Sequence, residues 1–95
     1  MSDTGHSNIE SWRREIDRID EQMLELVNRR AHCAIEIGMI KRRLGLPLDV
    51  PEREAAIIDR VTAENTGPLD GDAIARIFEA VIGESRIAEG AMVER

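Results

Sequence analysis

Two cationic side chains lie at positions that favour a shared binding site. Arg30 interrupts an otherwise apolar stripe, and Lys41 follows eleven residues later. On a helix with about 3.6 residues per turn, these positions differ by only about 20° in direction and are about 16 Å apart along the axis. A guanidinium on an apolar stripe is costly unless an anion meets it, so Arg30 predicts a buried anion site.

A third cation, Arg13, precedes Arg30 by seventeen residues and lies about 100° away from it around the same helix. Arg13 therefore cannot easily reach the same site from its own helix. It could instead serve an identical site in a second copy of the chain.

The other polar candidates come from the second half of the chain: Arg53, Glu54, Ser85 and Glu89. The sequence offers no Cys–His or Ser–His pair, no glycine-rich phosphate loop and no carboxylate cluster for a metal. The site would therefore contain cations, one or two carboxylic acids and hydroxyl groups, but no activated nucleophile. Such a set suits a reaction that needs only positioning and electrostatic stabilisation. We therefore expect a ligand that carries at least two negative charges.

Each candidate also has an ordinary structural explanation. Arg53 and Glu54 are typical of a solvated first turn of a helix, and Glu89 of a helix surface. The hydroxyl of Ser85 could bond back to its own helix. Arg30 could form a purely structural ion pair across a dimer.

A long helix must carry the first three cations. Two series of residues spaced seven apart form one continuous apolar seam from Ile9 to Leu44, in which Arg30 is the one polar member. Ser7 and Glu10 form a capping-box pattern, so we expect a disordered tail over residues 1–7 and a helix over about 8–44. Gly45 fits the position just after its end.

Two shorter helices follow, over about 51–65 and 70–92, within a single domain that spans residues 8–95. Asp49 with Glu52 is a capping pattern for the first of them, and Asp70 is the expected N-cap of the second. No stretch alternates polar and apolar residues with a period of two, so the fold class is all-α with three helices.

The length of the first helix predicts a homodimer. Residues 8–44 would extend about 55 Å, whereas a compact domain of this size has a radius of gyration of about 13 Å. The two shorter helices cannot cover the whole seam. We therefore expect an intertwined homodimer in which the long helices pair and each Arg13 reaches the partner's site.

The bulk composition limits the partners. A net charge of −6 argues against a nucleic-acid surface. No apolar run approaches membrane-spanning length, and no signal peptide precedes the first helix. The single cysteine, Cys33, offers no disulfide framework and suits a reducing cytoplasm.

Several short motifs in order along the chain resemble the AroQ class of all-helical chorismate mutases. They are Arg13-x-x-Ile16-x-x-Ile19-Asp20, Leu26-x-x-x-Arg30, Ile37-Gly38-x-x-Lys41, Pro51-x-Arg53-Glu54, and Ile77-Phe78 followed by Ser85. The resemblance covers about residues 10–92. The turn at residues 65–69 is similar to that of mutase domains fused to prephenate dehydratase or to the first enzyme of the shikimate pathway.

This resemblance implies an intertwined helical homodimer with two sites, which converts chorismate to prephenate in the biosynthesis of phenylalanine and tyrosine. The reaction is an intramolecular Claisen rearrangement. It needs no covalent intermediate and no cofactor, which agrees with the missing nucleophile and metal.

By position, the resemblance implies that Arg30 and the partner's Arg13 clamp the two carboxylates of chorismate. Lys41 would hydrogen-bond a carboxylate and the ether oxygen whose bond breaks. Glu89 would face that oxygen from the opposite side, which makes Lys41, Glu89 and Arg30 the expected catalytic residues. Many relatives have glutamine at position 89, which donates a hydrogen bond at any pH, whereas glutamate donates only when protonated.

The resemblance assigns the remaining candidates to substrate binding. Glu54 would accept a hydrogen bond from the ring hydroxyl, and Arg53 and Ser85 would complete the polar shell. Some relatives have aspartate at the position of Val50, where the backbone N–H alone can make the contact.

Other functions remain open on the sequence. The same fold could act as an isochorismate-pyruvate lyase or as an amino-deoxychorismate mutase. A different class is a non-catalytic helical dimerisation or regulatory module. A separate enzyme of the shikimate pathway is a further possible partner.

Overall fold

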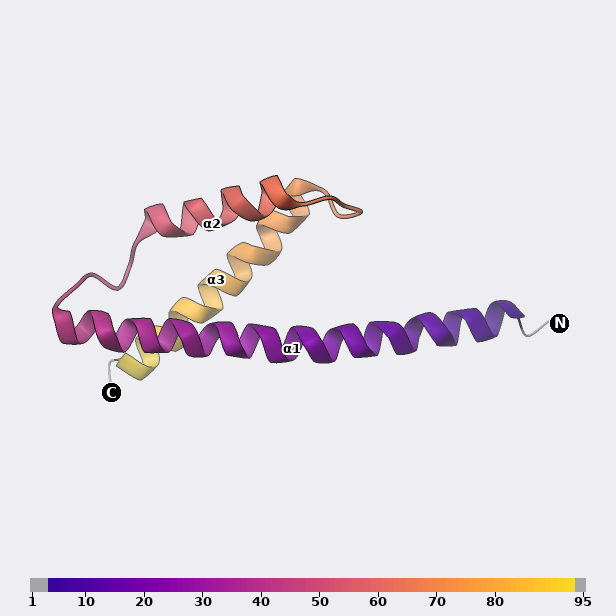
Figure 1. Ribbon diagram of the computed structural model, residues 1–95, viewed down its shortest axis with the longest axis horizontal. Helices are drawn as coiled ribbons and strands as arrows, with labels where there is room; N and C mark the ends of the chain where they lie inside the picture. Colours follow the sequence, from indigo (N-terminus) through magenta and orange to yellow (C-terminus); the bar gives the residue numbers. More distant parts are fainter. Residues whose placement is uncertain (1–3, 94–95) are drawn as a thin grey trace.

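The computed structural model describes the backbone of residues 4–93 and the side chains of residues 8–91. Three helices follow one another: α1 (Thr4–Leu44), α2 (Pro51–Glu64) and α3 (Gly71–Val93) (Figure 1). No strand occurs in the part of the chain that is described. The predicted all-α fold with one long and two shorter helices is therefore confirmed.

The end of α1 is fixed by its glycine. Gly45 has a positive φ of 71°, and its N–H donates to the carbonyl of Arg42 at 3.2 Å. The N–H of Leu46 donates to the carbonyl of Lys41 at 2.8 Å, which completes a Schellman motif. The last turn also carries three basic residues, which the negative end of the helix dipole favours. This end is close to the predicted one, and it places Lys41 beside the linker to α2.

The start of α1 differs from the prediction. The helix begins at Thr4, so residues 4–7 are helical rather than a tail; residues 1–3 lie outside the described part of the chain. A capping box stabilises a helix that starts at it, but it does not stop a helix that starts earlier. Residues 4–7 contain no proline, the residue that breaks a helix most strongly.

The N-cap of α2 is Val50 and not Asp49, and Pro51 occupies the first turn as predicted. The carbonyl of Val50 accepts hydrogen bonds from the N–H groups of Arg53 and Glu54 at 3.0 and 3.3 Å. Asp49 thus lies one position too early to cap, and the Val50 side chain forms no capping hydrogen bond. The helix ends at Glu64, one residue before the predicted end.

Helix α3 begins just after its predicted cap. The Oδ1 atom of Asp70 accepts a hydrogen bond from the N–H of Ala73 at 2.8 Å, which confirms Asp70 as the N-cap. The helix runs one residue beyond the predicted end. Helix α3 crosses the C-terminal half of α1 and also packs against α2 (Figure 1). In the described residues, the backbones of α1 and α2 do not pack against each other directly.

The single chain is elongated and has little interior. Its radius of gyration is 18.1 Å and its extents are 66 × 29 × 14 Å. Among the described side chains, Ile57 and Ile82 are the buried apolar ones, where α2 and α3 meet. The N-terminal half of α1 projects beyond the other two helices (Figure 1).

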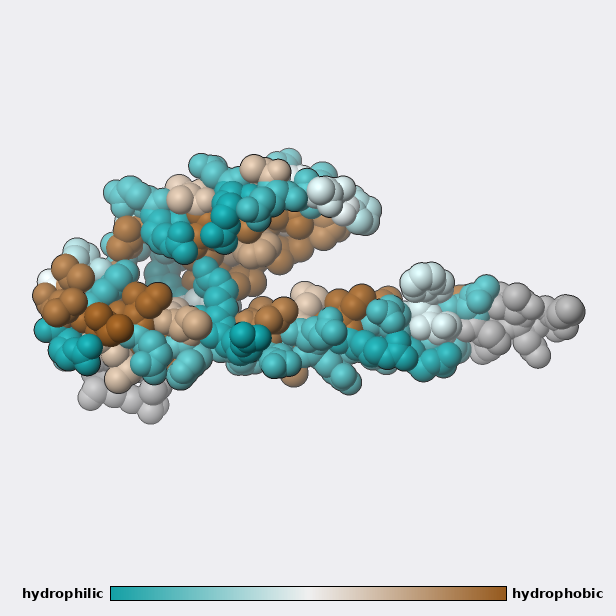
Figure 2. Space-filling model, viewed as in Figure 1, coloured by the Kyte–Doolittle hydropathy of each residue, from teal (hydrophilic) through white to brown (hydrophobic). Residues whose placement is uncertain are grey.

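The projecting part of α1 exposes large apolar side chains. Trp12 is 70% exposed, and Ile16, Met23 and Leu26 are each more than half exposed. Figure 2 shows brown, apolar side chains along the edge of α1 that faces the overhang of α2 and α3. The seam thus lacks cover within one chain. None of the described helices is both long and apolar enough to cross a membrane.

Candidate active site

One cavity of about 480 Å³ lies among α1, α2, α3 and the linker between α1 and α2. Its volume is in the range of small-molecule sites. The walls are partly apolar, with Ile37 from α1, Leu48 from the linker, Ile57 from α2 and Ile82 from α3. Apolar walls with a few polar groups are typical of small-molecule sites.

The polar groups of the cavity give it positive charge. Four cationic side chains line it: Arg30, Lys41, Arg53 and Arg86. Two carboxylates, Glu54 and Glu89, face them. This excess of positive charge, in a chain whose net charge is −6, indicates a site for an anion with about two charges.

Arg30 and Ser85 connect α1 to α3. The Nη1 atom of Arg30 donates to the Oγ atom of Ser85 at 2.8 Å, and Ser85 is only 3% exposed. No carboxylate among the described residues pairs with Arg30. A guanidinium has five N–H donors, so most of those of Arg30 remain for a ligand. A structural ion pair within one chain therefore does not account for Arg30.

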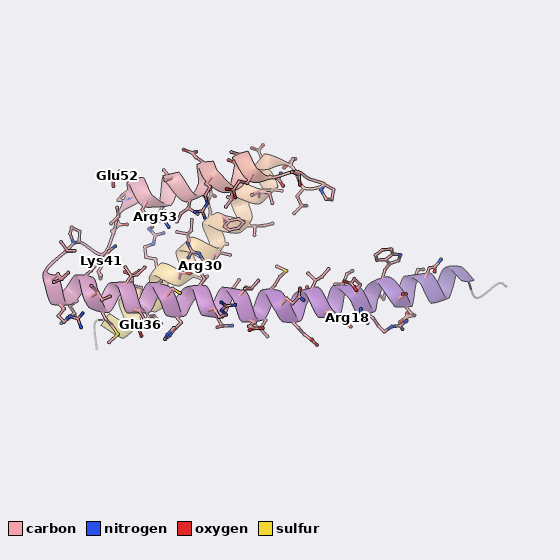
Figure 3. The ribbon with its side chains drawn as sticks, in the orientation of Figure 1. Arg18, Arg30, Glu36, Lys41, Glu52 and Arg53 are labelled. Atoms are coloured by element: carbon pink, nitrogen blue, oxygen red, sulfur yellow. The ribbon has the colours of Figure 1, made fainter. Side chains whose placement is uncertain are left out.

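Lys41 and Arg53 face the cavity from its opposite walls. Figure 3 shows Arg30 and Lys41 on the side of α1 that faces α2, and Arg53 directed from α2 toward α1. The Nζ atom of Lys41 donates to the carbonyl of Leu48 at 3.4 Å. In the same view, Glu36 lies on the opposite side of α1. The first turn of α2 thus directs Arg53 toward the cavity, although its side chain remains exposed.

Glu89 holds a buried oxygen without a partner. Its Oε1 atom is buried and has no hydrogen-bond partner among the described residues. An unsatisfied buried polar atom costs about 1–3 kcal/mol. A hydrogen-bond donor from a ligand would recover that free energy. This environment contradicts the surface explanation for Glu89.

Arg86 is a cavity residue that the sequence pattern did not single out. Its Nη1 atom lies 3.2 Å from Oε1 of Glu54 and 3.8 Å from Oδ1 of Asp49. It follows Ser85 directly, so it points about 100° away from that side chain and resembles a surface residue. The available signal is its position four residues after Ile82 and three before Glu89, which places it on their face of α3.

The chain brings all but one of the predicted site residues together. Arg30, Lys41, Val50, Arg53, Glu54, Ser85 and Glu89 line the same cavity. Arg13 is not among the lining residues; its side chain is 68% exposed on the projecting half of α1 and lies 3.0 Å from Glu10. No group of three His, Cys, Asp or Glu side chains in the described residues is arranged to hold a metal.

Residues 12–90 match the profile of a family described as chorismate mutase type II. A bifunctional chorismate mutase/prephenate dehydratase of Aquifex aeolicus is 40% identical over 78 residues, which cover 78% of this chain and 22% of the relative. The chain thus spans about a fifth of the length of such bifunctional relatives.

Two further proteins that are similar to this chain are named as chorismate mutases alone, without a second activity. A chorismate mutase of Methanocaldococcus jannaschii is 43% identical over 49 residues, or 52% of this chain and 50% of that protein. The solved structure of chorismate mutase (form II) from Thermus thermophilus superposes with a TM-score of 0.85 at 34% identity. That superposition covers 87% of this chain and 94% of the other.

Proposed function

Since the chain belongs to the chorismate mutase type II family, we propose that it converts chorismate to prephenate by an intramolecular Claisen rearrangement. The observation that carries the proposal is the cavity, in which four cationic side chains and two carboxylates meet between apolar walls. Chorismate is a dianion, and its rearrangement needs neither a nucleophile nor a redox group. Such a reaction depends on holding a reactive conformer and stabilising charge as it develops.

We assign the two substrate carboxylates to the arginines. Arg30 is held by its hydrogen bond to Ser85, so its guanidinium is oriented before the substrate arrives. A planar guanidinium can bind a carboxylate through two parallel hydrogen bonds. Arg30 would bind one carboxylate in this way, and the partner's Arg13 would bind the other.

Lys41 and Glu89 are the proposed catalytic pair at the ether oxygen. Negative charge grows on this oxygen as its bond to the ring breaks, so donors aimed at it stabilise the transition state. Lys41 provides an ammonium from α1, and Glu89 provides a carboxyl from α3. Glu89 can donate only in its protonated form, and its partnerless Oε1 atom is consistent with a group that acquires its partner in the complex.

The N-terminal end of α2 would bind the ring. Glu54 is placed to accept a hydrogen bond from the ring hydroxyl, and Arg53 adds positive charge to the same wall. The backbone N–H of Val50, at the N-cap of α2, is a further donor at the positive end of the helix dipole. Ser85 completes the shell by orienting Arg30.

The active enzyme is proposed to be an intertwined homodimer. The supporting observation is the apolar seam of α1, in which Trp12, Ile16 and Leu26 are more than half exposed in the single chain. Burial of such side chains contributes about 1.5–3 kcal/mol each. Pairing of the two long helices would cover this seam, and Arg13 on the same projecting segment would then reach the second cavity.

The test is direct. Purified protein mixed with chorismate should cause the ultraviolet absorbance of chorismate to fall, and Lys41→Ala should abolish most of that fall. No fall with folded wild-type protein would reject the function. By the same proposal the enzyme acts in the cytoplasm, in the biosynthesis of aromatic amino acids. Titration with other enzymes of the shikimate pathway would test for an activating partner.

A further inference from the structure

We propose that Arg86 is a positioning residue, which holds the Glu54 carboxylate toward α3 and keeps it away from the cations that bind the substrate. The inference rests on the function proposed above and concerns a residue outside the expected ligand set. Arg86 lines the cavity, and its Nη1 atom lies 3.2 Å from Oε1 and 3.5 Å from Oε2 of Glu54.

The contact with Arg86 orients the Glu54 carboxylate but leaves some of its hydrogen-bond acceptor positions free. One nitrogen of Arg86 lies near both oxygens of the carboxylate, so this ion pair favours the orientation of Glu54 toward α3 over rotation toward other donors. An ionised carboxylate has about four lone-pair positions. The pair with Arg86 therefore leaves acceptor positions for a hydroxyl of the substrate, and the Glu54 side chain is 31% exposed and accessible.

Other cations compete for the same carboxylate. Lys41 and Arg53 line the cavity with Glu54, and neither forms an ion pair with a carboxylate in the described part of the chain. Without Arg86, Coulomb attraction would draw Glu54 to one of them. The resulting internal ion pair would occupy a group that should bind the substrate, and the substrate would have to displace Glu54 to enter.

Arg86 also connects α3 to the segment that begins α2. Besides Glu54, its Nη1 atom lies 3.8 Å from Oδ1 of Asp49, in the linker before the N-cap of α2. The first turn of α2 carries both Arg53 and Glu54, so the contacts of Arg86 with Asp49 and Glu54 link that turn to α3. The two contacts together support positioning rather than direct binding of the substrate.

The first test compares Arg86→Met with Arg76→Met, which removes the same charge from an exposed position on α3 outside the cavity. We expect Arg86→Met to raise KM for chorismate about fivefold while kcat changes less than about twofold. Arg86→Lys should recover most of the loss, because an ammonium can still pair with Glu54. Equal KM values for Arg86→Met and Arg76→Met would overturn the proposal.

Glu54→Gln separates positioning from a general loss of charge. In the wild-type background this change should raise KM, because the ring hydroxyl loses its charged acceptor. In the Arg86→Met background it should lower KM, because a neutral amide is not drawn to Lys41 or Arg53. Multiplicative effects of the two substitutions would mean that they act independently, against the proposal.

A crystal structure of Arg86→Met gives a readout that does not depend on turnover. We expect the Glu54 carboxylate within hydrogen-bond distance of Lys41, Arg53 or Arg30. If Glu54 keeps its present orientation, the proposal is wrong whatever the kinetics. If wild-type protein fails to convert chorismate, the proposed function fails, and this structure still decides the role of Arg86.

Discussion

Replacing Arg30 with alanine removes the group that connects α1 to the buried hydroxyl of α3 and that should bind a substrate carboxylate. The charged hydrogen bond to Ser85 is 2.8 Å long, and Ser85 is only 3% exposed. Loss of one preorganised donor to transition-state charge costs about 3–4 kcal/mol, so kcat/KM should fall about 10² to 10³-fold.

The same substitution should have a small effect on folding. Ser85 loses its donor from Arg30, but a serine hydroxyl in a helix can donate to a carbonyl of the preceding turn. We therefore expect the free energy of unfolding to fall by about 1 kcal/mol. Arg29→Ala is the matched control, because Arg29 is the preceding residue of α1, is exposed and does not line the cavity.

The assay is the initial rate of chorismate loss at several substrate concentrations, with circular dichroism and gel filtration of each variant. Arg29→Ala should behave as wild type. Full activity of Arg30→Ala would refute the assignment of the cavity. If activity falls only in proportion to lost helicity, Arg30 is a structural residue and not a ligand of the substrate.

Three further predictions address the other parts of the site. Lys41→Ala should cut kcat/KM more than about a hundredfold with helicity intact, and an active variant would remove Lys41 from the ether oxygen. Arg13→Ala and Arg30→Ala should each be nearly inactive as homodimers, but refolding the two together should restore activity, because one site of each heterodimer then has both arginines. No recovery in verified heterodimers would mean that Arg13 does not act across the interface. For Glu89, a carboxyl at the ether oxygen donates a hydrogen bond only when it carries a proton, whereas an amide always donates, so Glu89→Gln should keep or raise kcat and Glu89→Ala should lower it. Equal loss of kcat in Glu89→Gln and Glu89→Ala would contradict this role.

The helices could be predicted because their signals are local. The seam from Ile9 to Leu44 has one period throughout, and Gly45 supplies the backbone conformation that ends α1. Asp70 caps α3 as expected. The errors lie in the start of α1, which is Thr4 and not residue 8, and in the N-cap of α2, which is Val50 and not Asp49, because a capping sequence favours one position without excluding a neighbouring one.

The cavity could be predicted in part. Arg30 and Lys41 share a face of one helix, so their convergence followed from helix geometry alone. The contact between Arg30 and Ser85 joins residues 55 positions apart, and such a distance depends on how α3 crosses α1. The same crossing decides that Glu89 has a buried oxygen and that Arg86 reaches Glu54. The helical period by itself does not give these relations.

The most direct test of the proposed chemistry is the stoichiometry of product formation by wild-type protein, followed by nuclear magnetic resonance. We predict that each chorismate consumed yields one prephenate, that no pyruvate is released, and that acid then converts the product to phenylpyruvate. Release of pyruvate would instead identify a lyase reaction in the same cavity. Stable chorismate in the presence of folded protein would contradict the assignment of this cavity as a chorismate mutase site.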